Sequence, residues 1–115
     1  MLDFNKIKNS KKLILIAGPC VIEHEDTTLE IAKKIKSIAN KFKIPYVFKA
    51  SYQKANRTRL NSFSGPGIDQ GLKILKKIKD KFNIAITTDV HNVNDVNQLN
   101  GIVDIIQIPA FLCRQ

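Results

Sequence analysis

The sequence contains no tryptophan, two cysteines and few aromatic residues, which make up 7% of its 115 residues. Cys20 and Cys113 lie far apart and form no disulfide framework, so we expect a reduced, cytoplasmic protein. The longest uninterrupted apolar run, residues 13–17, is too short for a transmembrane helix or for a secretory signal. These absences predict a protein with no membrane partner.

Acidic residues are also scarce, since the sequence has ten Asp and Glu but nineteen Lys and Arg, which gives a net charge of +9. A strongly basic chain suggests nucleic-acid binding. Sixteen of the nineteen basic residues are lysines, however, and they are spread along the chain rather than gathered in one patch. We therefore expect no nucleic-acid partner, and a positive field that attracts small anionic substrates.

What the sequence does contain is an alternation of short apolar runs and amphipathic stretches. Thr27 and Glu30 have the spacing of a capping box at the start of the first helix. The apolar run at residues 13–17 predicts a strand that is buried on both faces. The predicted strands are residues 13–17, 46–48, 84–89 and 103–108, and the predicted helices are residues 27–43, 68–82 and 93–99.

The order β-α-β-α-β-α-β predicts an α/β protein with a parallel sheet and right-handed crossovers. Four strands suit either a small open sheet or half of a (β/α)₈ TIM barrel, which needs about 200–250 residues when complete. Only residues 109–115 follow the last strand, with no helix to cover it, which favours the half barrel. We expect residues 1–115 to form one partial barrel domain, with residues 1–12 as a leading segment and the chain ending after the fourth strand.

Polar residues follow each predicted strand, at the edge where parallel α/β proteins bind ligands. The loop after the second strand is the densest in cations, and two of the three arginines lie there. Ammonium, guanidinium, hydroxyl and amide groups together suit a phosphorylated polyol, although a solvated loop in a basic protein is the alternative. The candidate residues are Cys20, Lys49, Ser51, Lys54, Asn56, Arg57, Thr58, Asp89, His91 and Gln107, with Pro109 and Ala110 beside the last strand.

Three single residues have both a structural and a functional interpretation. Cys20 is either a small buried side chain or a metal ligand. Asp89 ends an apolar strand, where a carboxylate is costly unless it is paired or used. His91 is either a proton shuttle or a hydrogen-bonded structural histidine.

Six ordered motifs resemble the 3-deoxy-D-manno-octulosonate 8-phosphate synthase family. The similarity covers nearly all of the chain after about Lys11. The Ala-Asn-Arg segment at residues 55–57 distinguishes it from the related 3-deoxy-arabino-heptulosonate 7-phosphate synthases. The motifs are residues 16–23 (IAGPCVIE), 46–51 (YVFKAS), 54–57 (KANR), 65–67 (GPG), 87–91 (TTDVH) and 106–115 (IQIPAFLCRQ).

The resemblance implies a homotetrameric (β/α)₈ barrel. The implied reaction condenses phosphoenolpyruvate with arabinose 5-phosphate and releases phosphate, a step towards the Kdo sugar of lipopolysaccharide. Lys54, Asn56 and Asp89 are the implied catalytic residues. The implied substrate-binding residues are Lys49, Ser51, Lys54, Asn56, Arg57, Thr58, Gln107, Pro109 and Ala110.

The family divides by the residue at position 20, where metal-dependent members have cysteine and metal-independent members have asparagine. The resemblance thus implies that Cys20 binds Zn²⁺, Fe²⁺ or Mn²⁺, with His, Glu and Asp ligands from the second half of the barrel. Arg59 and Ser64 depart from the family pattern, which usually has Ser and Arg at these positions.

The 115-residue chain alone is expected to be inactive. The alternatives are a heptulosonate synthase that uses erythrose 4-phosphate, and a non-catalytic truncated chain that assembles with a partner.

Overall fold

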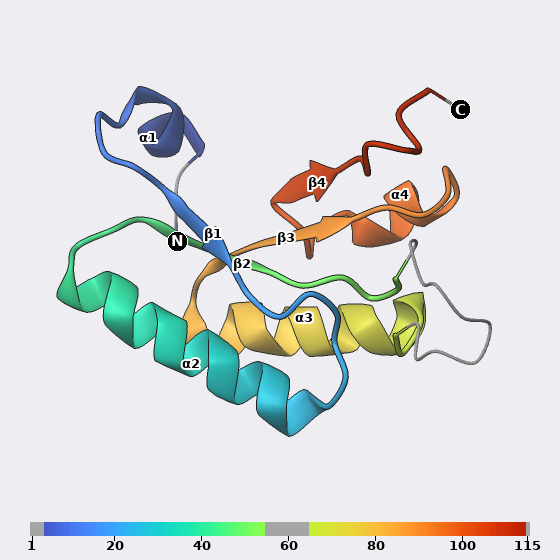
Figure 1. Ribbon diagram of the computed structural model, residues 1–115, viewed down its shortest axis with the longest axis horizontal. Coiled ribbons are helices and arrows are strands. Elements are labelled where there is room, and N and C mark those ends of the chain that lie inside the picture. Colours follow the sequence, from blue (N-terminus) through green and yellow to red (C-terminus); the bar gives the residue numbers. More distant parts are fainter. Residues whose placement is uncertain (1–3, 55–64, 115) are drawn as a thin grey trace.

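The computed structural model describes residues 4–54 and 65–114. In this part of the chain the elements are α1 (Phe4–Asn9), β1 (Leu15–Ala17), α2 (Glu25–Lys41), β2 (Tyr46–Lys49), α3 (Ile68–Phe82), β3 (Ala85–Asp89), α4 (Asp95–Leu99) and β4 (Ile105–Gln107). The four strands form one sheet in the order β1-β2-β3-β4, and each neighbouring pair is parallel (Figure 1). The predicted α/β class and the order of its strands are confirmed.

The boundaries differ from the predicted ones mainly at the edges of the sheet. β1 and β4 have three residues each, because ladder pairing covers only part of each apolar run. The predicted capping box is wrong, since α2 begins at Glu25, ahead of Thr27, and its cap residue His24 makes no side-chain hydrogen bond. Instead, Thr28 donates its hydroxyl to the carbonyl of His24 at 2.7 Å. Helix α1 lies within the segment predicted only as a leader.

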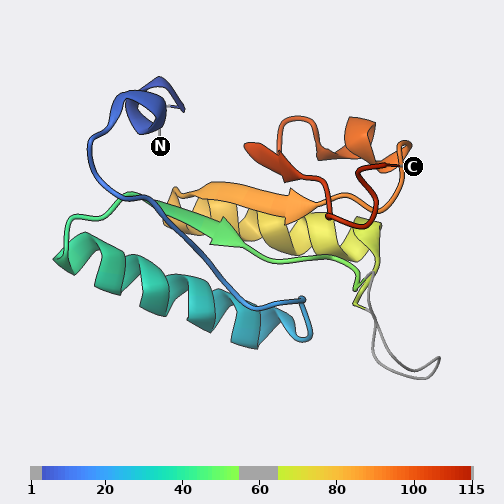
Figure 2. The same ribbon diagram turned by 45° about the horizontal axis from the view of Figure 1, so that its top comes forward.

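One face of the sheet packs against α2 and α3, which lie side by side (Figures 1 and 2). The resulting apolar core contains alternate residues of the two central strands. These are Tyr46 and Phe48 on β2, Ile84 directly before β3, and Ile86 on β3. Because strand side chains alternate between faces, the residues between them face the other side. This second face carries Lys49 and Asp89.

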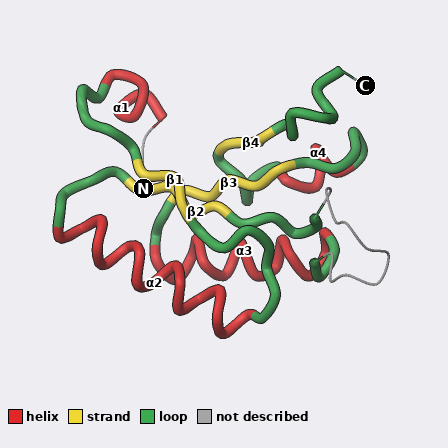
Figure 3. Tube along the Cα trace, viewed as in Figure 1, coloured by secondary structure: helices red, strands yellow, loops and turns green. Residues whose placement is uncertain are grey.

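The second face is only partly covered, and here the prediction for the first strand is wrong. Ile16 is 50% exposed and Leu13 is 89% exposed, so the run at residues 13–17 is not buried on both faces. β1 is the outer strand of the sheet, and no layer of the described residues covers its second face (Figure 3). Apolar residues at such an edge are typical of a sheet that continues into further structure.

Helix α3 places its apolar residues on the core and most of its lysines in solvent, as its spacing predicts. Leu72, Leu75 and Ile78 are buried, whereas Lys73 and Lys76 are exposed. Among the helices that the structure describes, none combines the length and apolarity that crossing a membrane requires.

Candidate functional site at the carboxyl edge of the sheet

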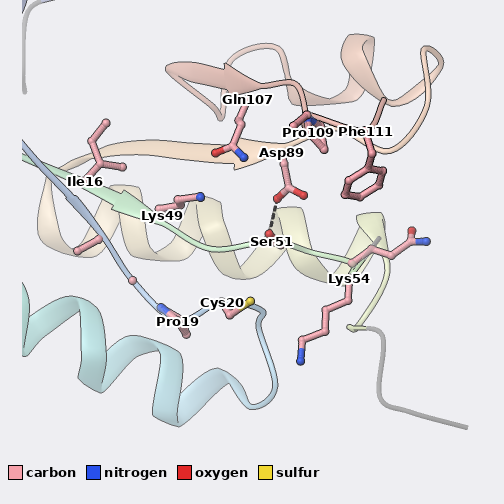
Figure 4. Close-up of a pocket in the computed structure, with 14 residues that line it drawn as sticks. Ile16, Pro19, Cys20, Lys49, Ser51, Lys54, Asp89, Gln107, Pro109 and Phe111 are labelled. Atoms are coloured by element: carbon pink, nitrogen blue, oxygen red, sulfur yellow. Dashed lines mark hydrogen bonds between the residues drawn. The ribbon is translucent and has the colours of Figure 1, made fainter. Parts of the chain in front are cut away.

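A cavity of about 510 Å³ opens at the carboxyl edge of the sheet (Figure 4). It contains eight residues that the sequence marked as candidates, and they come from the ends of all four strands. Its lining residues are Ile16, Ala17, Gly18, Pro19, Cys20, Lys49, Ser51, Gln53, Lys54, Asp89, Gln107, Pro109, Ala110 and Phe111.

The register of the parallel strands positions the polar side chains. Lys49, Asp89 and Gln107 are the last residues of β2, β3 and β4. Asp89 pairs directly with Gln107, and Lys49 pairs with Thr87 two residues before Asp89. All three therefore lie on one face, in adjacent rows, where the polar groups of successive strands meet.

Gly18 lets the loop after β1 approach the end of β2 closely. A Cβ atom at Gly18 would lie 1.8 Å from the backbone oxygen of Lys49, so no side chain fits there. The close approach is extended by a bridge between Val21 and Ser51, with hydrogen bonds from Ser51 N to Cys20 O and from Ile22 N to Ser51 O. Cys20 is thereby held beside the end of β2.

Two of the lining residues, Lys49 and Lys54, are cations with no anionic partner in the described part of the chain. Neither Lys49 nor Lys54 makes an ion pair with any residue that the structure describes. Lys49 extends along the cavity from the end of β2, while the ammonium group of Lys54 points away from Asp89 (Figure 4). Partly enclosed, unpaired ammonium groups attract phosphate or carboxylate groups.

Asp89 is the anion of the site, and each of its carboxylate oxygens lies close to a polar side chain. Ser51 donates its hydroxyl to Oδ1 (Figure 4), and His91 Nε2 lies 3.1 Å from Oδ2. The His91 contact has the distance of an ion pair but not the angles of a hydrogen bond. The structure places the His91 side chain against Asp89, and only 7% of that side chain is exposed.

Cys20 is exposed at the cavity, and its sulfur is free. Nowhere in residues 4–54 and 65–114 do three His, Cys, Asp or Glu side chains gather closely enough to hold a metal ion. One thiolate does not make a zinc or iron site, which needs at least three protein ligands. The residues present therefore do not complete a metal centre.

Several candidates are not placed, and some lining residues were not anticipated. Asn56, Arg57, Thr58, Arg59 and Ser64 lie outside the described residues. Gln53, Ile16 and Phe111 line the cavity although none of them was among the predicted site residues. Ile16 and Phe111 each had one signal, because they lie in the first and in the last of the six motifs.

Comparison with known proteins agrees with the fold. A model of the DAHP synthetase I family matches residues 5–115. The chain belongs to the DAHP synthetase I family. Its parallel β-α succession is accordingly part of a (β/α)₈ barrel.

Three curated relatives of this family member carry the name 2-dehydro-3-deoxyphosphooctonate aldolase. The one from Koribacter versatilis is 55% identical over 119 residues, covering all of this chain and 43% of the relative. The one from Geotalea daltonii is 51% identical over 110 residues, covering 96% of this chain and 40% of the relative. The one from Campylobacter jejuni subsp. doylei is 52% identical over 105 residues, covering 91% of this chain and 39% of the relative. The chain thus spans about two fifths of the length of these relatives.

Proposed function

We propose that this chain supplies the first four strands of an enzyme that condenses phosphoenolpyruvate with D-arabinose 5-phosphate. The products are 3-deoxy-D-manno-octulosonate 8-phosphate and inorganic phosphate, on the route to the Kdo sugar of lipopolysaccharide. The observation that carries the proposal is a single cavity lined by Lys49, Lys54 and the carboxylate of Asp89, in which neither lysine has an ion-pair partner among the described residues. The name of the relatives, 2-dehydro-3-deoxyphosphooctonate aldolase, supports the proposal, because a three-carbon and a five-carbon substrate together give a phosphorylated octonate skeleton.

In the proposed reaction, C3 of phosphoenolpyruvate attacks the aldehyde carbon of the sugar. Water then adds at C2, and the hemiketal phosphate collapses by cleavage of its C–O bond. Lys49 and Lys54 offset the repulsion between two anionic substrates and hold them in reach of one another. We assign Asp89 to the reacting centre, Asn56 and Arg57 to the sugar phosphate, and Pro109 and Ala110 to the phosphoenolpyruvate side.

The metal and the quaternary structure belong to the same proposal. Cys20 is the one metal ligand that we assign to this chain, for Zn²⁺, Fe²⁺ or Mn²⁺, and any complete site requires ligands from outside the described residues. We further propose that the complete enzyme is a homotetramer.

The test uses a completed barrel, defined as residues 1–115 joined to the part of the Koribacter versatilis relative that follows its matched segment. Phosphate release from phosphoenolpyruvate is measured with arabinose 5-phosphate and with erythrose 4-phosphate. We expect release with the five-carbon sugar and little with the four-carbon sugar. Absence of release with both sugars would contradict the proposal, provided that the intact relative is active in the same assay.

A second candidate is a heptulosonate synthase, which the name of the matched family favours. Faster release with erythrose 4-phosphate than with arabinose 5-phosphate would establish it. The 115-residue chain alone is the third arm of the assay, and we expect no release from it. A non-catalytic partner chain would leave the completed barrel inactive as well.

A further inference from the structure

Two buried polar side chains beside the site, Tyr52 and Asp95, have no part in the proposed reaction. Tyr52 is completely buried and Asp95 is 7% exposed. The Tyr52 hydroxyl donates a hydrogen bond to Asp95 Oδ2 at 2.8 Å. Neither residue lines the cavity. A buried phenol–carboxylate pair is costly to desolvate, so its presence calls for an explanation.

The pair is connected to the site through His91. The rings of Tyr52 and His91 meet edge to face, with centroids 5.1 Å apart and an interplanar angle of 74°. His91 Nε2 lies 3.1 Å from Asp89 Oδ2. A continuous chain of contacts therefore runs from Asp95 through Tyr52 and His91 to the carboxylate of Asp89.

The structure leaves Tyr52 little room to move. A Cβ atom at Gly71 of α3 would lie 2.4 Å from Tyr52 Cβ, so the absence of a side chain there lets the tyrosine pack directly against the helix. Gly67 N donates to the backbone oxygen of Tyr52 at 3.2 Å. Burial, and then the hydrogen bond to Asp95, raise the pKa of Tyr52 well above its usual value, so the phenol remains a donor.

We infer that Tyr52 and Asp95 are positioning residues that fix the His91 ring and, through it, the Asp89 carboxylate at the cavity. Ser51 donates a hydrogen bond to one oxygen of Asp89 and the largely buried His91 ring lies 3.1 Å from the other, so both neighbours restrict the rotation of the carboxylate. A site whose groups are held in this way reacts faster than one whose groups must first be oriented. The inference rests on the proposed function, because it takes Asp89 as part of the reacting centre.

The chain offers a matched control for Tyr52 in Tyr46. Both tyrosines lie on the same face in and after β2, and both are buried. Tyr46 is the first residue of β2, and it donates its hydroxyl to the backbone carbonyl of Ala17, the last residue of β1, at 2.9 Å. Replacement of either tyrosine by phenylalanine removes one buried hydrogen bond and keeps the ring.

In the completed barrel we expect Tyr52→Phe to lower kcat about tenfold and to change both KM values less than about twofold. Tyr46→Phe is expected to keep kcat within about twofold of the parent. Asp95→Ala should resemble Tyr52→Phe, and Asp95→Asn should restore most of the rate because its amide oxygen still accepts from the phenol. Equal kcat in Tyr52→Phe and Tyr46→Phe would overturn the inference.

A second readout does not depend on activity. The imidazole ¹⁵N and ¹H signals of His91 in the completed barrel are assigned with His91→Gln. They should shift and broaden in Tyr52→Phe and Asp95→Ala but not in Tyr46→Phe. His91 signals unchanged in Tyr52→Phe would overturn the inference. A barrel that is inactive with every sugar yet shows the expected shifts would refute the proposed function and leave the positioning contacts standing.

Discussion

The central strands β2 and β3 differ sharply from the outer strands β1 and β4. β3 is buried along its whole length and β2 at all but its last residue, whereas every residue of β1 and β4 is at least partly exposed. Lys49 and Asp89 stand at the ends of the two central strands, while Cys20 and Gln107 depend on the outer ones. The lysine and the aspartate of the site thus stand on the most buried part of the sheet.

Each outer strand pairs with one neighbouring strand, and further contacts attach it to the sheet. The Asp104 carboxylate just before β4 accepts a hydrogen bond from Ile86 N at 2.8 Å and pairs with Lys79 of α3 at 3.0 Å. On the other side, β1 is fixed to β2 by the close approach at Gly18. The comparison teaches that the edge strands place their site residues through one ladder and a few specific contacts, whereas the central strands also have the core beneath them.

The largest expected effect separates a central isoleucine from an outer one. Ile86 of β3 is completely buried, and Ile106 of β4 is 42% exposed. We expect Ile86→Ala to lower the free energy of unfolding by about 2–5 kcal/mol, because it removes buried methyl groups and leaves a cavity. Ile106→Ala should cost less than about 1 kcal/mol. Urea denaturation followed by circular dichroism measures both, and similar losses would contradict the distinction between the strands.

The next effect tests the contact between β1 and β2. Gly18→Ala places a Cβ atom against the backbone oxygen of Lys49, so the two strand ends must move apart, at a cost of about 1–3 kcal/mol. Gly101→Ala is the control, because Gly101 has open space around it and only its positive φ of 82° causes strain, worth about 1 kcal/mol. Thermal unfolding compares the two. An equal shift in both variants would show that the strand contact is loose.

A smaller effect is expected at the attachment of β4. Asp104→Ala leaves the backbone N–H of Ile86 without this acceptor and should cost about 1–2 kcal/mol. Its control is Asp80→Ala, which removes a surface pair with Lys76 worth about 0.3–0.5 kcal/mol. Denaturation midpoints distinguish them. If Asp104→Ala cost no more than Asp80→Ala, the carboxylate would not be what holds β4.

The smallest expected effect is a pH dependence of the free energy of unfolding, which comes from Tyr46 on the central strand β2. Burial raises the pKa of Tyr46 above its ordinary value of 10.0, so the unfolded chain releases this proton first. The stabilisation is therefore complete below about pH 10 and is lost as pH rises from there towards the raised value. Between about pH 9 and pH 11, the free energy of unfolding should fall less steeply with pH in Tyr46→Phe than in the parent chain. An unchanged slope would mean that Tyr46 ionises freely in the folded protein.

The sequence predicted the central elements better than the edges. The spacing of Ile68, Leu72, Leu75 and Ile78 gave the bounds of α3, because its periodicity comes from the core that it faces. The run at residues 13–17 gave no sign that Ile16 is exposed, since exposure depends on what lies across the sheet. Periodicity along one segment carries no information about neighbours distant in the chain.

The site was predictable to the extent that it follows strand ends. Lys49, Asp89 and Gln107 come together because parallel strands end at one edge, and that rule needs no coordinates. Tyr52 was not predictable in this way, because it lies in a polar segment without a period. Its contacts with His91 and Asp95 depend on Gly71, nineteen positions later, and only the packed structure brings them together.

The central claim is that the cavity at the carboxyl edge binds the anionic substrates. The most direct test is the rate of phosphate release by the completed barrel carrying Lys49→Met, beside the exposed-lysine control Lys33→Met on α2. Methionine keeps the apolar stem of lysine and removes its charge. We predict that Lys49→Met lowers kcat/KM at least about 100-fold while Lys33→Met leaves it within about twofold. Equal rates in the two variants would contradict the claim.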